Sequence, residues 1–368
     1  MRFVFWVPRP SIHVRPLANA LVNRGHDVVV VADAPPLAER AALGAAPVAE
    51  SGVREVVAPD QAQRASLLKR GPESFHYFAG LGVYDGVSST LAASTPGSGT
   101  RAVFMESLRP GLVRGPLRRA VYFRRWYENR TAVDCFLAAG QDAVAQTRQM
   151  FGHRVPVHEF AYFVNSPTTL SATSRSPKVN IGFVGQLVDR KNVQLLIRAM
   201  ARLDSGSLRL NVVGTGSQRD RLRALVERLN VDVVFHGVLS NSEVPAFLAL
   251  QDCLVLPSKF DGWGAVVNES LSVGTPVLVS DRVGARSLLA DPSMGQVFGE
   301  GSVVALTEAL RSVVSREPVP VRLRRRIMAE SAARFSPAVG AEYLIRIAHE
   351  PSLVRTPPWR QGGLGEDR

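Results

Sequence analysis

The chain has 368 residues, of which 46% are hydrophobic and 21% charged, and it carries a formal net charge of +12. This length exceeds what one hydrophobic core usually supports, so we expect two domains of ordinary globular composition. No apolar run approaches the roughly 18 residues of a membrane-spanning helix, and the apolar run after Met1 is too short for a secretory signal. We therefore expect a cytoplasmic protein.

The excess of positive charge favours an anionic partner, and no helix-turn-helix, zinc-finger or RNA-binding signature accompanies it. Phosphorylated small molecules and acidic lipid head groups are therefore better candidates than nucleic acid. The two cysteines, Cys135 and Cys253, each stand alone in an apolar stretch. This spacing argues against a disulfide framework or a clustered zinc site and predicts two buried, reduced thiols.

Short β-branched runs alternate with helical stretches along the whole chain, a pattern typical of parallel α/β architecture. The first domain is expected to cover residues 1–166 and to contain a helix over residues 16–24, which Gly25 ends with a left-handed cap. Its predicted strands are residues 2–7, 28–31, 102–105 and 135–138.

A polar stretch rich in Ser, Thr and Pro predicts a linker over residues 167–178, and a second domain is expected over residues 179–335. Its strands are predicted at residues 179–184, 208–213, 232–235, 253–256 and 276–279, with helices at 193–203 and 219–229. Ser336 and Pro337 indicate the start of a helix over residues 336–350, which we expect to cross back to the first domain. Residues 351–368, rich in Pro and Gly, are expected to form a loosely ordered tail.

The strongest candidate site follows the strand at residues 253–256, where parallel sheets bind ligands at their carboxyl edge. It is the segment Asp261-Gly262-Trp263-Gly264-Ala265-Val266-Val267-Asn268-Glu269. A helix is predicted to start near Gly264 or Ala265, and the N–H groups of a helix start suit a diphosphate. The missing side chains of the two glycines allow a ligand to approach the backbone. Asp261 and Glu269 can accept hydrogen bonds from sugar or ribose hydroxyls.

A second candidate loop follows the strand at residues 179–184 and contains Gln186, Arg190, Lys191 and Asn192. Arg190 and Lys191 are adjacent cations at the same predicted sheet edge as Asp261, and either could neutralise a departing diphosphate. Asn192 is a candidate N-cap for the next helix. By itself this loop would more often be a pair of solvated cations, but its position at the same sheet edge as Asp261 reverses this preference and favours a ligand site.

Six short motifs then follow one another in a fixed order. They are Gly185-Gln186 with Arg190-Lys191-Asn192, Val213-Gly214-Thr215-Gly216, Phe235-His236-Gly237, Leu256-Pro257-Ser258, Asp261-Gly262-Trp263-Gly264 with Asn268-Glu269, and Gly274-Thr275-Pro276 with Ser280-Asp281. In this order the chain resembles the C-terminal domain of retaining GT-B glycosyltransferases of family 4. The resemblance is close over residues 179–281 and loose elsewhere.

The resemblance implies a GT-B fold, with two Rossmann-like β/α/β domains facing each other across a cleft. It also implies a retaining, metal-independent transfer of a sugar from a UDP- or GDP-sugar, with no cofactor. By position, Asp261 matches the acid that contacts the donor sugar, Glu269 the acid that contacts the ribose, and Lys191 the phosphate-binding lysine. The family reads the nucleotide base near Val238. Two residues depart from the family pattern: Asp261 replaces a more usual Glu, and Gln186 replaces a more usual Arg, for which Arg190 could compensate.

The N-terminal domain departs further from the family, because the glycine pair of its first loop is absent. His13 and Arg15 lie in that place and could touch donor phosphate or acceptor, although a surface pair without function is an equal alternative. A His is usual after a middle strand of this domain, whereas here the strand at residues 102–105 is followed by Glu106. We expect Glu106 to act as a base on the acceptor or to bind a donor hydroxyl; the alternative is a loop acid paired with Arg109.

The segment from Arg109 to Arg130 contains seven arginines, one acid and several aromatic residues. Basic residues mixed with interfacial aromatics suit a helix that lies on anionic lipid, such as the inner face of the plasma membrane. A solvated basic helix whose aromatics pack inward is the competing interpretation.

The sequence therefore predicts a glycosyltransferase of the hexosyltransferase type. Its acceptor would be a saccharide, a glycolipid or a small molecule, and its role cell-surface polysaccharide or glycoconjugate biosynthesis. One alternative is a GT-B sugar-nucleotide epimerase, which needs no acceptor. Another is a catalytically silent binding protein recruited to a membrane by its basic face, which the departures at Gln186 and in the N-terminal domain make conceivable.

Overall fold

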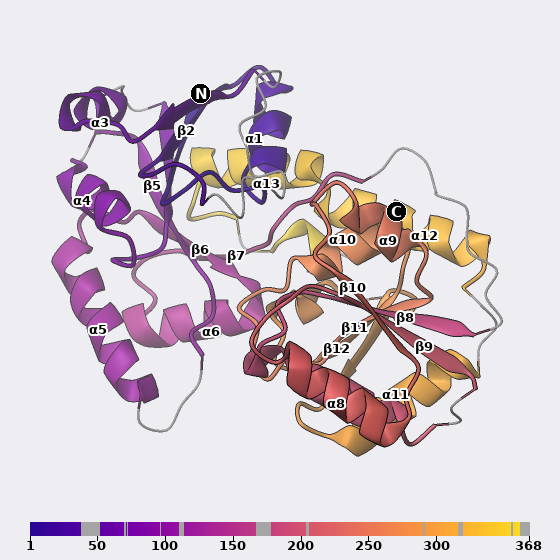
Figure 1. Ribbon diagram of the computed structural model, residues 1–368. Coiled ribbons are helices and arrows are strands. Elements are labelled where there is room, and N and C mark those ends of the chain that lie inside the picture. The colour runs from indigo at the N-terminus through magenta and orange to yellow at the C-terminus, as the bar shows by residue number, and fades with distance from the viewer. Residues whose placement is uncertain are drawn as a thin grey trace. The chain divides into compact units, whose positions relative to one another are not determined.

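A computed structural model describes the chain from residue 1 to residue 360, except for residues 38–51, 70, 72, 96, 110–113, 167–177, 204–205, 290, 316–318 and 355. The chain forms two compact units (Figure 1). The N-terminal unit comprises Met1–Phe163 together with Phe335–Arg368, and the C-terminal unit comprises Val164–Arg334. Most of the predicted linker lies outside the described residues.

The N-terminal unit contains a parallel sheet with the strand order β3-β2-β1-β4-β5-β6-β7. Its strands are β1 (Arg2–Val7), β2 (Asp27–Ala32), β3 (Arg54–Val57), β4 (Ser74–Ala79), β5 (Thr100–Met105), β6 (Cys135–Ala139) and β7 (Val157–Phe160). Four of them match the predicted strands within two residues. The β-branched pattern missed three strands: β4, whose sequence Ser-Phe-His-Tyr-Phe-Ala is aromatic and polar, β3, which is short and half-buried at one sheet edge, and β7, which is short and lies at the opposite edge.

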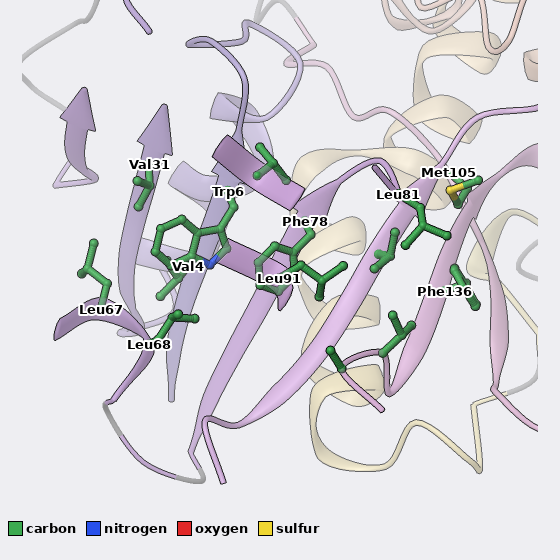
Figure 2. Close-up of a cluster of buried hydrophobic side chains, with 14 of the residues drawn as sticks. Val4, Trp6, Val31, Leu67, Leu68, Phe78, Leu81, Leu91, Met105 and Phe136 are labelled. Carbon is green, nitrogen blue, oxygen red and sulfur yellow. The ribbon is translucent and has the colours of Figure 1, made fainter. Parts of the chain in front are cut away.

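The helices of this unit are α1 (Arg15–Val22), α3 (Gln61–Leu68), α4 (Asp85–Ala93), α5 (Arg114–Asn129), α6 (Gly140–Phe151) and α13 (Pro337–His349). One face of the sheet packs on a core built around Trp6 and Phe78, whose rings stack with centroids 6.1 Å apart. Figure 2 shows Leu91 beside them, with Val31 towards one end of the cluster and Leu81, Met105 and Phe136 towards the other. Because both faces are covered, every residue of β1 is buried.

The C-terminal segment of the chain belongs to this N-terminal unit. Helix α13 begins as the sequence indicates, with the Ser336 hydroxyl accepting a hydrogen bond from the Val339 N–H at 3.4 Å, and it packs on α1. The expectation of a loosely ordered tail is wrong as far as Arg360. Trp359 is fully buried, and the Arg360 guanidinium forms an ion pair with the buried Glu159. An aromatic side chain that the core can accept outweighs the Pro- and Gly-rich composition around it.

The C-terminal unit contains a second parallel sheet with the order β10-β9-β8-β11-β12-β13. Its strands are β8 (Val179–Val184), β9 (Leu208–Val213), β10 (Val233–Gly237), β11 (Cys253–Leu256), β12 (Val277–Ser280) and β13 (Gly295–Phe298). Its helices are α7 (Val193–Met200), α8 (Arg219–Leu229), α9 (Val244–Ala249), α10 (Val266–Ser272), α11 (Val303–Val314) and α12 (Val321–Phe335). The five predicted strands of this domain are confirmed, and β13 was not predicted. Asn192 precedes α7 in a left-handed conformation, and its side chain makes no cap bond, so its predicted role as a side-chain cap is wrong.

The two expected Rossmann-like α/β domains are thus confirmed. Both cysteines are buried and free, as their isolation predicted. None of the helices in the described ranges is long and apolar enough to cross a bilayer.

Candidate functional site

Four loops meet at the carboxyl edge of the C-terminal sheet, after β8, β9, β11 and β12. The first two approach so closely that a Cβ on Gly214 would lie 2.0 Å from the carbonyl oxygen of Gly185. The Leu187 N–H donates to the Thr215 carbonyl at 2.8 Å and joins the same two loops. Only glycine fits at position 214, which also has a φ of 131°. The Gly-Thr-Gly motif therefore sets the shape of the edge.

Lys191 ends a short 3₁₀ turn, Asp189–Lys191, after β8. It is only 8% exposed, and its ammonium forms an ion pair with the carboxylate of Asp261. One guanidinium nitrogen of Arg190 lies 3.7 Å from the other carboxylate oxygen of Asp261. The structure therefore brings together the three charged residues that the sequence placed on this edge.

The loop that carries Asp261 is fixed from both sides. The Asp261 N–H donates to the Arg282 carbonyl at 3.0 Å, and its carbonyl accepts from the Gly284 N–H at 3.1 Å. Lys259, which sequence reasoning did not single out, joins this loop to the loop after β8. Its ammonium bonds the Asp189 carboxylate at 2.7 Å, and its N–H donates to the Arg190 carbonyl at 2.8 Å. A lysine close to a strand end was the available sequence signal.

Trp263 lies beneath this loop. Its side chain is 1% exposed, and its indole N–H donates to the Asn268 side-chain oxygen at 2.8 Å. Trp263 can therefore contribute to a ligand site at this loop only through its backbone. Gly264 serves packing in the same way, because a Cβ there would lie 2.9 Å from the Leu256 side chain. Both residues hold the loop in place.

The other donor-site candidates differ in exposure. Glu269 lies in α10, and burial raises the pKa of its carboxyl from 4.5 to about 7. Gln186 is exposed, and Val238 is 49% exposed just after β10. Gly262 is buried and Ala265 is half-buried at the start of α10. A half-buried carboxyl whose pKa is about 7 has the chemistry to bind hydroxyl groups.

A separate cluster occupies the carboxyl edge of the N-terminal sheet. The Tyr162 hydroxyl, beyond β7, donates to the Glu106 carboxylate, beyond β5, at 2.5 Å. The Tyr162 ring also contacts the rings of His13 and Phe104, with centroids 5.1 and 5.5 Å away. Burial and the negative charge of Glu106 hold the pKa of Tyr162 well above its usual value, so this phenol stays a donor. Two predicted residues, Glu106 and His13, thus share a site whose central residue the sequence did not reveal.

The ion pair of Arg15 lies away from this cluster. The Arg15 guanidinium lies 3.2 Å from the Glu55 carboxylate on β3. Strands β3 and β5 lie on opposite sides of β1 in the sheet order, so Glu55 and Glu106 are several strands apart. The structure therefore groups Arg15 with the β3 side of the edge, apart from Glu106.

Helix α5 divides its aromatic residues between two faces. Tyr122 and Trp126 pack against the core cluster of the N-terminal unit. Leu117, Phe123 and Tyr127 are 68%, 49% and 55% exposed. The Arg124 side chain is 83% exposed beside Glu128. The inward packing of aromatic residues is thus present on one face of the helix, while the other face carries exposed apolar and basic side chains. The side chains of Arg114 and Arg118 lie outside what the structure describes.

Two Rossmann-like units with parallel sheets define the GT-B architecture. The family described as glycosyl transferases group 1 matches residues 171–345. This match agrees with the resemblance of the chain's motifs to retaining GT-B glycosyltransferases. Over the parts of the chain that the structure describes, no cluster of three or more acidic, His or Cys side chains could hold a metal ion.

Curated relatives match part of the chain. LpsE of Rhizobium meliloti, a lipopolysaccharide core biosynthesis glycosyltransferase, is 30% identical over 169 residues, or 46% of this chain and 49% of that protein. The 2-deoxystreptamine glucosyltransferase of Streptomyces kanamyceticus is 34% identical over 145 residues, or 38% and 37% of the two chains. The chain thus spans less than half the length of these relatives in each match.

The likeness of fold extends further than the likeness of sequence. The structure of Anabaena HepE in complex with UDP is similar with a TM-score of 0.70 at 16% identity. The match covers 95% of this chain and 100% of the HepE chain. At this identity the similarity concerns the fold of both units.

Proposed function

We propose that the protein is a glycosyltransferase of the hexosyltransferase type that moves a sugar from a UDP- or GDP-sugar to a saccharide, glycolipid or small-molecule acceptor. The observation that carries this proposal is the buried Lys191, paired with Asp261 and flanked by Arg190, at the sheet edge where α/β folds bind ligands. The names of the relatives support a place in cell-surface polysaccharide or glycoconjugate biosynthesis.

In this proposal the C-terminal unit binds the donor. Lys191 and Arg190 attract the diphosphate and stabilise the negative charge that grows on it as the sugar departs. Asp261 accepts hydrogen bonds from sugar hydroxyls and Glu269 from the ribose. The backbone near Val238 contacts the base. Gln186 and the backbone of residues 262–265 complete the surroundings of the phosphates.

We propose further that the reaction retains the configuration of the sugar and needs no metal ion. Two cations within one loop supply the positive charge that stabilises a leaving diphosphate. In the N-terminal unit, Glu106 is the proposed base for the acceptor hydroxyl, with His13 beside it. The hydrogen bond from Tyr162 gives Glu106 a defined position, which a general base requires.

Ligand-induced thermal stabilisation tests the donor assignment. We expect one of the uridine, guanosine, adenosine and thymidine diphosphates to stabilise the protein, by about 2.7 kcal/mol at a hundred times its dissociation constant. Lys191→Ala should abolish this shift and lower turnover of the matching sugar nucleotide about a hundredfold, because a buried cation at the phosphates is lost.

Lys178→Ala is the matched control. Lys178 lies directly before the start of β8, at the end of the strand opposite the candidate site, and its ammonium lies 2.8 Å from the Asp232 carboxylate. The loss of Lys178 should therefore leave nucleotide binding unchanged. Turnover of Lys191→Ala within about threefold of wild type would contradict the donor assignment, since one lost transition-state contact costs far more. A new epimer formed from the donor alone would favour the epimerase instead.

We also propose that α5 attaches the protein to an anionic membrane from the cytoplasmic side. Its solvent face combines Leu117, Phe123 and Tyr127 with Arg119 and Arg124, a mixture suited to a lipid interface. Each cation near such a surface contributes about 1 kcal/mol.

Sedimentation with vesicles tests this surface. The double variant Arg119→Gln/Arg124→Gln should bind phosphatidylglycerol vesicles at least tenfold more weakly than wild type, because two cations at about 1 kcal/mol each are lost. The control is Arg221→Gln/Arg228→Gln on the exposed face of α8, which changes the net charge equally. Equal losses in both variants would show that net charge, and not α5, drives the binding.

A further inference from the structure

Lys191 is a buried cation that depends on one carboxylate. It is 8% exposed, and Asp261, its partner, is 9% exposed. Across the described residues, Asp261 is the acid within ion-pair distance of Lys191. A buried charge that loses its partner is strongly destabilised. Whatever draws Lys191 away from Asp261 must therefore supply another anion to the lysine and another donor to the carboxylate.

The two partners differ in their freedom to move. Backbone bonds at 3.0 and 3.1 Å fix Asp261 from both sides, and its side chain is short. Lys191 has a four-carbon stem that runs past Gly185, where a Cβ would already lie 3.7 Å from the Lys191 Cε. Without a side chain at that position, the stem can change its direction. An exchange of partners therefore proceeds through movement of the lysine.

Arg190 gives the carboxylate a second counter-ion. Its guanidinium lies 3.7 Å from the Asp261 oxygen that does not face Lys191, and its side chain is 39% exposed. When Lys191 turns away, Arg190 still compensates part of the negative charge of Asp261. One further donor at the carboxylate, such as a hydroxyl group, then replaces the lost lysine bond.

We infer that Asp261 makes the site distinguish a sugar nucleotide from a free nucleoside diphosphate by competing for Lys191. This inference rests on the proposed function. A free nucleoside diphosphate has to break the Lys191–Asp261 pair and leaves the carboxylate short of a donor. A sugar nucleotide brings hydroxyls that replace Lys191 at Asp261 and release the lysine to the diphosphate. After transfer the sugar is gone, Lys191 returns to Asp261, and the product is held more weakly.

Calorimetric titration of Asp261→Asn tests the inference. The nucleotide used is whichever of UDP and GDP binds the wild type, together with its glucose or mannose derivative. In Asp261→Asn the free nucleoside diphosphate should bind about tenfold more tightly than in wild type, within the range of ordinary coupling between sites. The sugar nucleotide should gain nothing, so that the preference for it over the free diphosphate is lost.

Two controls separate this effect from a general change in charge. Asp189→Asn removes the same charge from the neighbouring Asp189–Lys259 pair and should change diphosphate affinity less than about threefold, because this pair is exposed. In Lys191→Met/Asp261→Asn the gain should vanish, since the lysine that the substitution frees is absent. Asp261→Ser provides the same loss of charge if Asp261→Asn does not fold.

Affinity for the free diphosphate that is unchanged or lower in the folded Asp261 variants would overturn the inference. An equal gain in Asp189→Asn would do so as well. If the wild type binds neither UDP nor GDP nor their sugar derivatives, the proposed function fails instead. The two failures are therefore distinct.

Discussion

The carboxyl edges of the two sheets are built in different ways. In the C-terminal unit, the loops between residues 185 and 285 are joined by backbone hydrogen bonds and by glycines at close approaches, as at Gly214. In the N-terminal unit, the cluster of His13, Glu106 and Tyr162 is joined by side chains from three distant parts of the chain. Local sequence motifs therefore describe the edge of the C-terminal sheet, but they do not describe the edge of the N-terminal sheet, although the two units have similar architecture.

The segment around Trp359 and Arg360 adds a further long-range contact to the N-terminal unit. Glu159 in β7 forms an ion pair with Arg360 and a 3.3 Å hydrogen bond with the Trp359 indole. The Trp359 ring packs on Tyr343 and Phe163, with centroids 5.6 and 6.1 Å away. Tyr162 lies directly before Phe163. The C-terminal tail therefore supports the segment that carries the central residue of the N-terminal cluster.

Trp359→Ala should produce the largest difference in behaviour between the two units. Removing a fully buried indole should cost about 3–5 kcal/mol of the free energy of unfolding. The loss should fall on the N-terminal unit, while nucleotide binding by the C-terminal unit at low temperature stays as in wild type. Urea denaturation followed by circular dichroism measures the loss. Leu353→Ala, at a site that is 67% exposed in the same tail, is the control and should change stability by less than about 0.5 kcal/mol.

Tyr162→Phe should impair the edge of the N-terminal sheet alone, without unfolding either unit. It keeps the ring that packs on His13 and Phe104 and removes the hydroxyl that bonds Glu106. Loss of a hydrogen bond to a charged group predicts a roughly tenfold lower kcat. Nucleotide affinity should not change, because the donor residues lie in the other unit. Tyr127→Phe on the exposed face of α5 should leave kcat unaltered. Equal losses of kcat and nucleotide affinity in Tyr162→Phe would contradict separate roles for the two edges.

Glu269→Gln should change the stability of the protein in a way that depends on pH. Burial raises the pKa of Glu269 from 4.5 to about 7, so the folded protein holds this proton more tightly than the unfolded chain. The contribution of Glu269 to the free energy of unfolding is fully present below pH 4.5 and is lost as the pH rises to about 7. The Tm of Glu269→Gln relative to wild type should therefore increase between these values and level off above them. A constant difference in Tm across this range would show that burial does not raise this pKa.

Sequence reasoning found the strands of the C-terminal unit and placed Lys191, Arg190 and Asp261 at one edge. It succeeded there because parallel strands end at the same edge and because charged residues stand directly after them. It did not reveal that the side chain of Trp263, which stands within one of the motifs, lies beneath the loop. A motif specifies which residues occur, whereas packing decides which of their side chains face a ligand.

The sequence by itself determined the α/β class, the resemblance to a glycosyltransferase family and the loops that carry the candidate site residues, because strand ends, glycines and charges are local features. Only the tertiary structure decided that Tyr162 bonds Glu106, that the tail is ordered through Trp359, and that Lys191 and Asp261 pair directly. These contacts join residues 56, 200 and 70 positions apart. Their formation depends on the strand order of each sheet and on the burial of aromatic rings, which no local pattern encodes.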